Sequence, residues 1–107
     1  MLYKFKTKSS ADVIMMGPHG DHVLRLLGRE PAPKGILEVA HMPAAVTALE
    51  AAVEADERAH AEAQAEAEAN GETPPQREGV SLRQRVWPLV EMIKRAHKQG
   101  HDIVWGV

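Results

Sequence analysis

The chain has 107 residues, of which 44% are hydrophobic, and a formal net charge of −2 at pH 7. This length fits one domain with its own core, and the acidic balance argues against a dedicated nucleic-acid-binding protein. The lack of cysteine excludes disulfides, thiol nucleophiles and thiolate metal sites. No run approaches the roughly 18 apolar residues of a membrane span, and no signal peptide is evident, so we expect a cytoplasmic protein.

The net charge conceals an uneven distribution along the chain. Residues 1–37 and residues 73–107 each carry six Lys/Arg and three Asp/Glu, whereas residues 38–72 carry one Arg and nine Asp/Glu. Two basic ends, each of charge +3, therefore flank an acidic middle segment of charge −8.

The N-terminal part predicts a β-hairpin. Residues 2–8 alternate, with Tyr3, Phe5 and Thr7 on one face and three lysines on the other, as in a strand with one buried face. Residues 9–12 suit a turn. Residues 13–16 are all apolar and indicate a second strand that is apolar on both faces.

The next segment predicts a short helix followed by an extended stretch. Gly17 and the proline after it break the second strand, and Asp21 is a suitable N-cap for a helix over residues 22–27. Two prolines keep residues 29–34 extended, and residues 36–39 are a candidate third strand.

A longer helix is predicted from residues 41–43 onward, because proline is tolerated in a first helical turn. Val46, Leu49 and Val53 are spaced i, i+3 and i+7, so this helix packs on the core as far as Val53. Residues 59–69 then almost alternate alanine with Glu or Gln, which are strong helix formers and poor strand formers. We therefore expect an exposed helical arm.

Alanine contacts alone cannot hold this arm against the body. Burying one methyl contributes about 0.8 kcal/mol, whereas ordering one backbone unit costs about 1–2 kcal/mol. We assign the arm and the linker after it to residues 58–79, within a single domain of residues 1–107.

The C-terminal part predicts a capped helix and a closing strand. Ser81 and Gln84 form a capping-box pattern, Gly100 ends the helix, and residues 102–105 form a strand that pairs with the N-terminal hairpin. The order ββα(β)ααβ predicts an α+β fold, in which helices cover one face of a small, mainly antiparallel sheet.

Sequence blocks spread over nearly the whole chain carry a resemblance to one family. The blocks are residues 2–8 with 12–15, Pro33-Lys-Gly-Ile, Met42-Pro-Ala-Ala, Val80-Ser-Leu-Arg-Gln-Arg-Val-Trp-Pro-Leu and Ile103-Val-Trp-Gly-Val. On these blocks the chain resembles the bacterial family catalogued as domain of unknown function 1840. The resemblance implies a small bacterial cytosolic protein and brings no catalytic or binding residues with it.

Two histidines mark the candidate ligand site. His19 and His22 lie three residues apart in the Gly17–His22 strand-to-helix turn, where neutral imidazoles and a ligand from elsewhere could hold zinc. The same turn could bind phosphate through free backbone N–H groups, although Asp21 would occupy those donors and repel an anion. The alternative is a plain turn with solvated surface histidines.

Two basic groups are candidates for contacts with other molecules. Lys4, Lys6 and Lys8 could contact nucleic-acid phosphates, or they could form a solvent face that discourages edge-to-edge sheet pairing. We favour the second interpretation, because no aromatic residue interleaves with them. The second group consists of two arginines and two tryptophans: Arg83, Arg85, Trp87 and Trp105. These residue types are enriched at interface hot spots, so the group could form a protein-binding face. The alternative is that its members are only core and rim residues.

The sequence favours binding over catalysis. No nucleophile–base pair or paired carboxylates occur at a diagnostic spacing, so we lean against an enzyme and expect no cofactor. The prediction is a non-catalytic protein-interaction or oligomerisation module, with a protein partner or further copies of itself. The alternative is a small-ligand or metal-binding protein that uses the Gly17–His22 turn.

Overall fold

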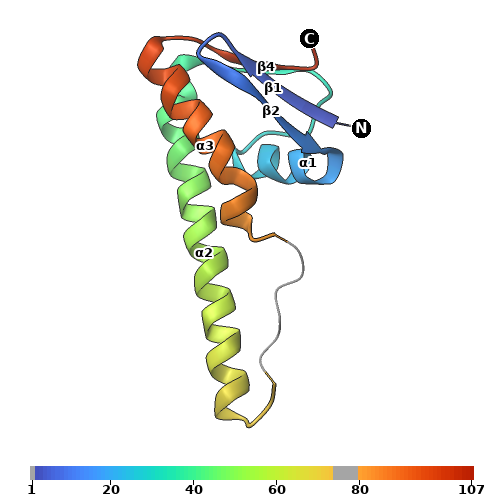
Figure 1. Cartoon of the computed structure of the whole chain (residues 1–107), viewed down its shortest axis with the longest axis vertical. Coiled ribbons are helices and arrows are strands. Elements are labelled where there is room, and N and C mark those ends of the chain that lie inside the picture. Colours follow the sequence, from blue (N-terminus) through green and yellow to red (C-terminus); the bar gives the residue numbers. More distant parts are fainter. Residues whose placement is uncertain (1, 74–79) are drawn as a thin grey trace.

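The computed structural model describes residues 2–73 and 80–107 and shows an α+β protein, as predicted (Figure 1). The part of the predicted linker over residues 74–79 lies outside the described residues. The elements in chain order are β1 (Leu2–Thr7), β2 (Ser10–Met16), α1 (Gly17–Leu26), β3 (Gly35–Leu37), a 3-10 turn (Val39–His41), α2 (Met42–Ala69), α3 (Leu82–Gln99) and β4 (Ile103–Trp105).

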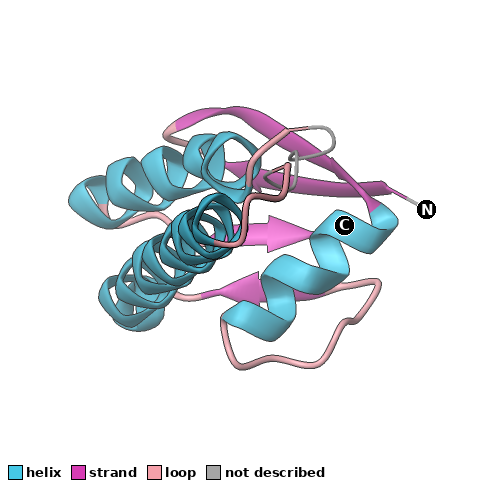
Figure 2. Cartoon of the chain, turned by 90° about the horizontal axis from the view of Figure 1, so that it is seen from below, coloured by secondary structure: helices cyan, strands magenta, loops and turns pink. Residues whose placement is uncertain are grey.

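The strands form one antiparallel sheet in the order β2-β1-β4-β3. The C-terminal strand pairs with β1 of the hairpin, which confirms the predicted closure. The third strand begins one residue before its predicted start and ends at Leu37, after which the chain enters the 3-10 turn. Helices cover one face of this sheet (Figure 2).

The core lies between the helices and the covered sheet face. Tyr3 and Phe5 of β1 are each 2% exposed, and Phe5 packs against Trp105 with their ring centroids 5.7 Å apart. The predicted stripe of α2 is buried at Leu49 and Val53. The largest buried group of a single helix comes from α3: Val86, Leu89, Val90, Met92, Ile93 and Ala96.

The first helix begins earlier than predicted. Helix α1 starts at Gly17, directly after β2, with Pro18 in its first turn and Met16 as an N-cap that makes no side-chain bond. The prediction that Asp21 caps this helix is wrong, because Asp21 lies inside it and accepts a hydrogen bond from the Tyr3 hydroxyl. Proline at the start of a helix is favourable, since its missing N–H has no partner to lose there.

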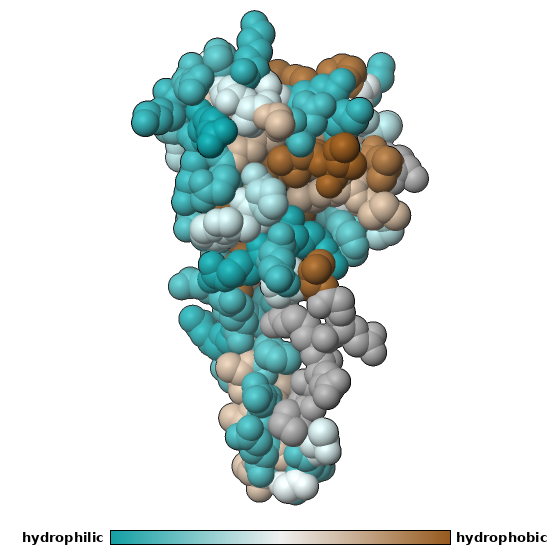
Figure 3. All heavy atoms as spheres, in the orientation of Figure 1, coloured by the Kyte–Doolittle hydropathy of each residue, from teal (hydrophilic) through white to brown (hydrophobic). Residues whose placement is uncertain are grey.

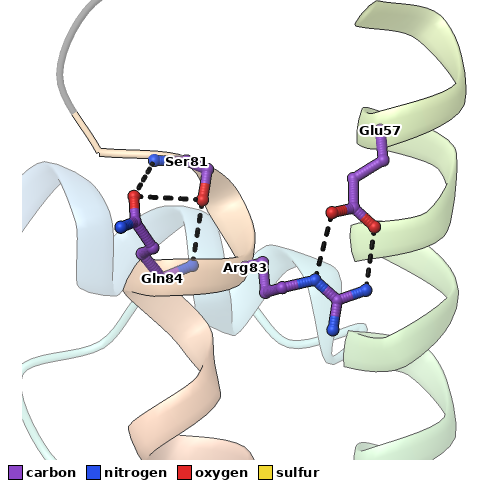
Figure 4. A network of polar contacts seen from close by, with 4 residues as sticks. All are labelled: Glu57, Ser81, Arg83 and Gln84. Carbon is purple, nitrogen blue, oxygen red and sulfur yellow. Dashed lines mark hydrogen bonds and ion pairs between the residues drawn. The ribbon is translucent and has the colours of Figure 1, made fainter. Parts of the chain in front are cut away.

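The start of α3 and the C-terminal ends of α2 and α3 lie where the sequence predicts. The Ser81 hydroxyl accepts from the Gln84 backbone N–H at 3.2 Å, and the Gln84 side chain accepts from the Ser81 backbone N–H at 3.0 Å (Figure 4). This reciprocal capping box fixes the start of α3. At its other end Gly100 takes a left-handed φ of 75°. Helix α2 runs without a break to Ala69.

Candidate functional site

The sheet face that no helix covers is the most distinctive surface of the molecule. Because Tyr3, Phe5, Ile103 and Trp105 point into the core, the alternate positions must point outward. Strand register then assigns the following residues to this open face: Leu2, Lys4, Lys6, Ile14, Met16, Ile36 and Val104.

The open face is apolar to an unusual degree for a surface. In the described part of the chain six large hydrophobic side chains are exposed, and four of them lie here: Leu2 at 62%, Ile14 at 57%, Met16 at 60% and Ile36 at 41%. Figure 3 shows hydrophobic side chains gathered at the sheet end of the molecule. A cluster of this kind marks an interaction surface more often than scattered single residues do.

Lysines run through this apolar face along β1. Lys4 is directly opposite Ile14 on β2, and Lys6 is opposite Val104 on β4. The interpretation that these lysines protect a sheet edge is wrong, because β1 is an inner strand with a partner on each side. Lys4 and Lys6 instead give the apolar face a positive charge.

A strongly acidic surface lies at the opposite end of the molecule. Helix α3 starts beside Glu57 of α2, so residues 58–69 continue beyond the helix pair (Figure 1). Within residues 58–69 every residue is exposed except His60 and Ala67. Four residues of the arm follow one another at spacings of three or four, which places them on one helix face: Ala59, Glu62, Glu66 and Ala69.

Arg83 and Trp87 lie at the seam between α2 and α3. The Arg83 guanidinium donates to both carboxylate oxygens of Glu57, at 2.8 and 3.0 Å (Figure 4). These bonds, and then the charge of Glu57, raise the pKa of Arg83. The Trp87 ring lies under two cations, with Arg83 5.2 Å and Lys94 5.5 Å from its centroid. Arg83 therefore braces α3 against α2, whereas the cation–π contacts of Trp87 lie within α3.

The other two residues of the predicted Arg/Trp group lie elsewhere. Trp105 is 3% exposed, its indole N–H donates to the carbonyl of Ala32, and it belongs to the core. Arg85 is half-buried in a groove beside β2. The structure thus divides the four residues among the helix seam, the core and this groove.

The Gly17–His22 segment is not the strand-to-helix turn that the sequence suggested. Its residues form the first six positions of α1, with His19 half-buried and His22 exposed. Within residues 2–73 and 80–107 no three His, Asp or Glu side chains gather closely enough for a metal ion. The described part of the chain therefore offers the two histidines no third ligand.

A hollow of about 610 Å³ lies at the end of the open face where the hairpin turn meets β4. It is lined by Lys6, Lys8 and His101 among others, and the Nδ1 atom of His101 lies 2.6 Å from the Ser9 hydroxyl. A serine–histidine pair becomes a catalytic unit only when a third group orients the imidazole. The neighbouring Asp102 carboxylate instead accepts from the backbone N–H of Val39 at 3.0 Å.

Sequence reasoning missed the open face, although one signal for it was present. Residues 13–16 are apolar at every position, so a strand there must direct hydrophobic side chains to both faces of the sheet. Since helices cover only one face, the other face has to remain apolar and exposed. The alternating pattern of β1 gave the opposite impression, because its outward residues include lysines.

Comparisons with known proteins give the family. The model of a family described as a domain of unknown function (DUF1840) matches residues 1–105, and the chain belongs to this family. The comparison with curated proteins and the comparison with solved structures each found no match. No helix among the described residues has the length and apolar character to cross a bilayer.

Proposed function

We propose that this protein is an oligomerisation module, in which the acidic arm of one copy docks on the open sheet face of another copy. The observation that carries the proposal is the open face itself, which combines exposed Leu2, Ile14 and Met16 with Lys4 and Lys6. Side chains of this size contribute about 1.5–3 kcal/mol each when they are fully buried. A partner that covers the face would recover part of that free energy.

The arm matches this face in charge and in spacing. Lys4 and Lys6 are separated by two strand residues, or about 7 Å. Glu62 and Glu66 are separated by four helical residues, or about 6 Å. The flanking alanines, Ala59 and Ala69, are small enough to let the helix approach the apolar side chains closely. The acidic arm is therefore a suitable partner for a basic, apolar strand surface.

The contact joins two different surfaces, so a pair of copies still has one free face, on the copy that gives its arm, and one free arm, on the other copy. Such head-to-tail contacts close into a ring or continue as an open chain, depending on the rotation between copies. An exposed ion pair adds only about 0–1 kcal/mol, and salt screens it. We therefore expect association that grows with protein concentration and weakens as salt is added.

Sedimentation velocity over a range of concentrations and salt tests this proposal. We expect wild-type protein to associate at low salt and the variant K4E/K6E to remain monomeric, because its face repels the acidic arm. The matched control R95E/K98E alters net charge equally at exposed positions of α3 and should associate like wild type. A wild-type chain that stays monomeric at every concentration and salt would refute the proposal.

A further inference from the structure

A groove runs along the outer edge of β2 and is separate from the acidic arm. Its volume is about 490 Å³. Residues 12–16 of β2 form one wall. The other wall combines one residue of α1, three residues from the N-terminal half of α3 and a residue two positions before α3: His19, Gln84, Arg85, Pro88 and Val80. The groove therefore lies between a strand edge and a helix.

Among the described residues, nothing pairs with the outer edge of β2 in this groove. Strand β2 is the end strand of the sheet, and β1 is its one partner among the described strands. Over residues 2–73 and 80–107, no backbone hydrogen bond outside the regular elements involves β2. Natural proteins usually protect a long edge with lysine or proline, yet residues 10–16 contain neither.

Arg85 provides an unused polar group at the same place. Its Nε atom is buried in the structure and has no hydrogen-bond partner. The adjacent Gln84 side chain cannot supply one, because its oxygen is already bonded to Ser81 in the capping box. A guanidinium presents its N–H groups in a planar fork that suits a carboxylate. Because Arg85 also lines the groove, its remaining guanidinium N–H groups are the candidate donors to an anionic ligand group there.

We propose that the groove binds an extended peptide segment, which pairs with β2 as a fifth strand and places a carboxylate on Arg85. Five strand residues span about 17 Å, so the groove accommodates four or five residues of such a segment. Strand addition derives affinity from backbone hydrogen bonds and specificity from the pockets for alternate side chains. Here the pocket residues are Pro88 and Val80 on the helix side, and Arg85 selects for negative charge.

The groove shares Ile14 and Met16 with the open face, but it can be tested separately from the proposed oligomerisation. Its key residue, Arg85, is not on the open face, and no described residue of the arm lines the groove. The K4E/K6E variant should therefore bind peptide as wild type does. The R85Q variant should retain the concentration-dependent association, so the two proposals can fail separately.

Affinity selection from a synthetic pool of random linear heptapeptides tests the groove. The pool is used in two forms, with the C-terminal carboxylate free or amidated. Enrichment of Asp or Glu in the amidated pool would identify a side-chain carboxylate, and binding by the free-acid pool alone would identify a C-terminal one. Either result supports the proposal. An absence of binding by both pools would overturn it, as would binders without any carboxylate dependence.

Two modifications of the best-binding peptide separate the contributions of backbone and charge. N-methylation of alternate amides should abolish binding, because it removes the donors that pair with β2. R85Q should weaken binding at least about tenfold and erase the preference for Glu over Gln in the peptide, whereas R95Q should change neither. Unchanged affinity in R85Q would overturn the proposal. A β2-to-β2 dimer that excludes the peptide would do so too.

Discussion

At the scale of single residues, the contact between Tyr3 and Asp21 explains how α1 is held to the sheet. The Tyr3 ring is buried under α1, and its hydroxyl donates to the Asp21 carboxylate. Gly20 makes this approach possible, since a Cβ atom there would lie 2.0 Å from the ring. Burial first, and then the hydrogen bond and charge of Asp21, raise the pKa of Tyr3 to about 12.

This shift gives a pH-dependence that can be measured. The folded state holds the Tyr3 proton more tightly than the unfolded chain, whose tyrosine pKa is about 10. The stabilisation is therefore complete below pH 10 and is lost as the pH rises toward 12. We expect Tyr3→Phe to lower stability by about 1 kcal/mol at pH 7, because a hydrogen bond is lost.

Urea unfolding at several pH values provides the measurement for Tyr3→Phe. The difference in unfolding free energy between wild type and variant should shrink between pH 10 and 12, while other titrating groups cancel in the difference. A gap that stays constant over this range would show that the Tyr3 hydroxyl is not linked to folding.

At the scale of elements, the sequence predicts where most strands and helices lie, and it fails where tertiary structure decides. The period of two in β1 and the capping box at Ser81 are local signals, and both elements form as predicted. The start of α1 was misplaced because Gly17-Pro18 resembles a strand break as closely as it resembles a helix start. The structure shows that these residues are a helix start, because β2 ends at Met16 and α1 begins at the next residue.

The candidate site depended even more on tertiary structure. Alternation assigns Lys4 and Lys6 to one face of β1, but it does not give the strand order or the side on which the helices pack. Arg83 and Arg85 are two residues apart, so they point to different sides of α3, and the sequence grouped them together. Proximity along a helix was therefore a poor guide to a shared surface.

The arm is the element whose removal should cost the fold least. We expect a chain in which residues 58–79 are replaced by about eight Gly/Ser residues to unfold in one cooperative transition, within about 1 kcal/mol of wild type. In the described part of this segment Ala67 is the one buried residue. Thermal and urea melts followed by circular dichroism check the expectation. A broad, non-cooperative transition would show that the arm belongs to the folding unit.

At the scale of the whole molecule, shape and charge are arranged along one axis. The molecule measures 51 × 28 × 23 Å, and its long dimension comes from α2, whose 28 residues span about 42 Å. Figure 3 shows the apolar surface at the sheet end, with hydrophilic and weakly hydrophobic surface along the arm. A basic, apolar end and an acidic end on one elongated molecule favour contacts between unlike ends.

Mixing two charge-reversed chains tests this arrangement most directly. In K4E/K6E both ends are acidic, and in E62K/E66K both ends are basic, so each variant alone should remain monomeric in sedimentation velocity. Mixed in equal amounts, they should associate at low salt, because every arm then meets a face of opposite charge. Mixed variants that sediment as monomers, or either variant that associates by itself as wild type does, would contradict docking of the arm on the open face.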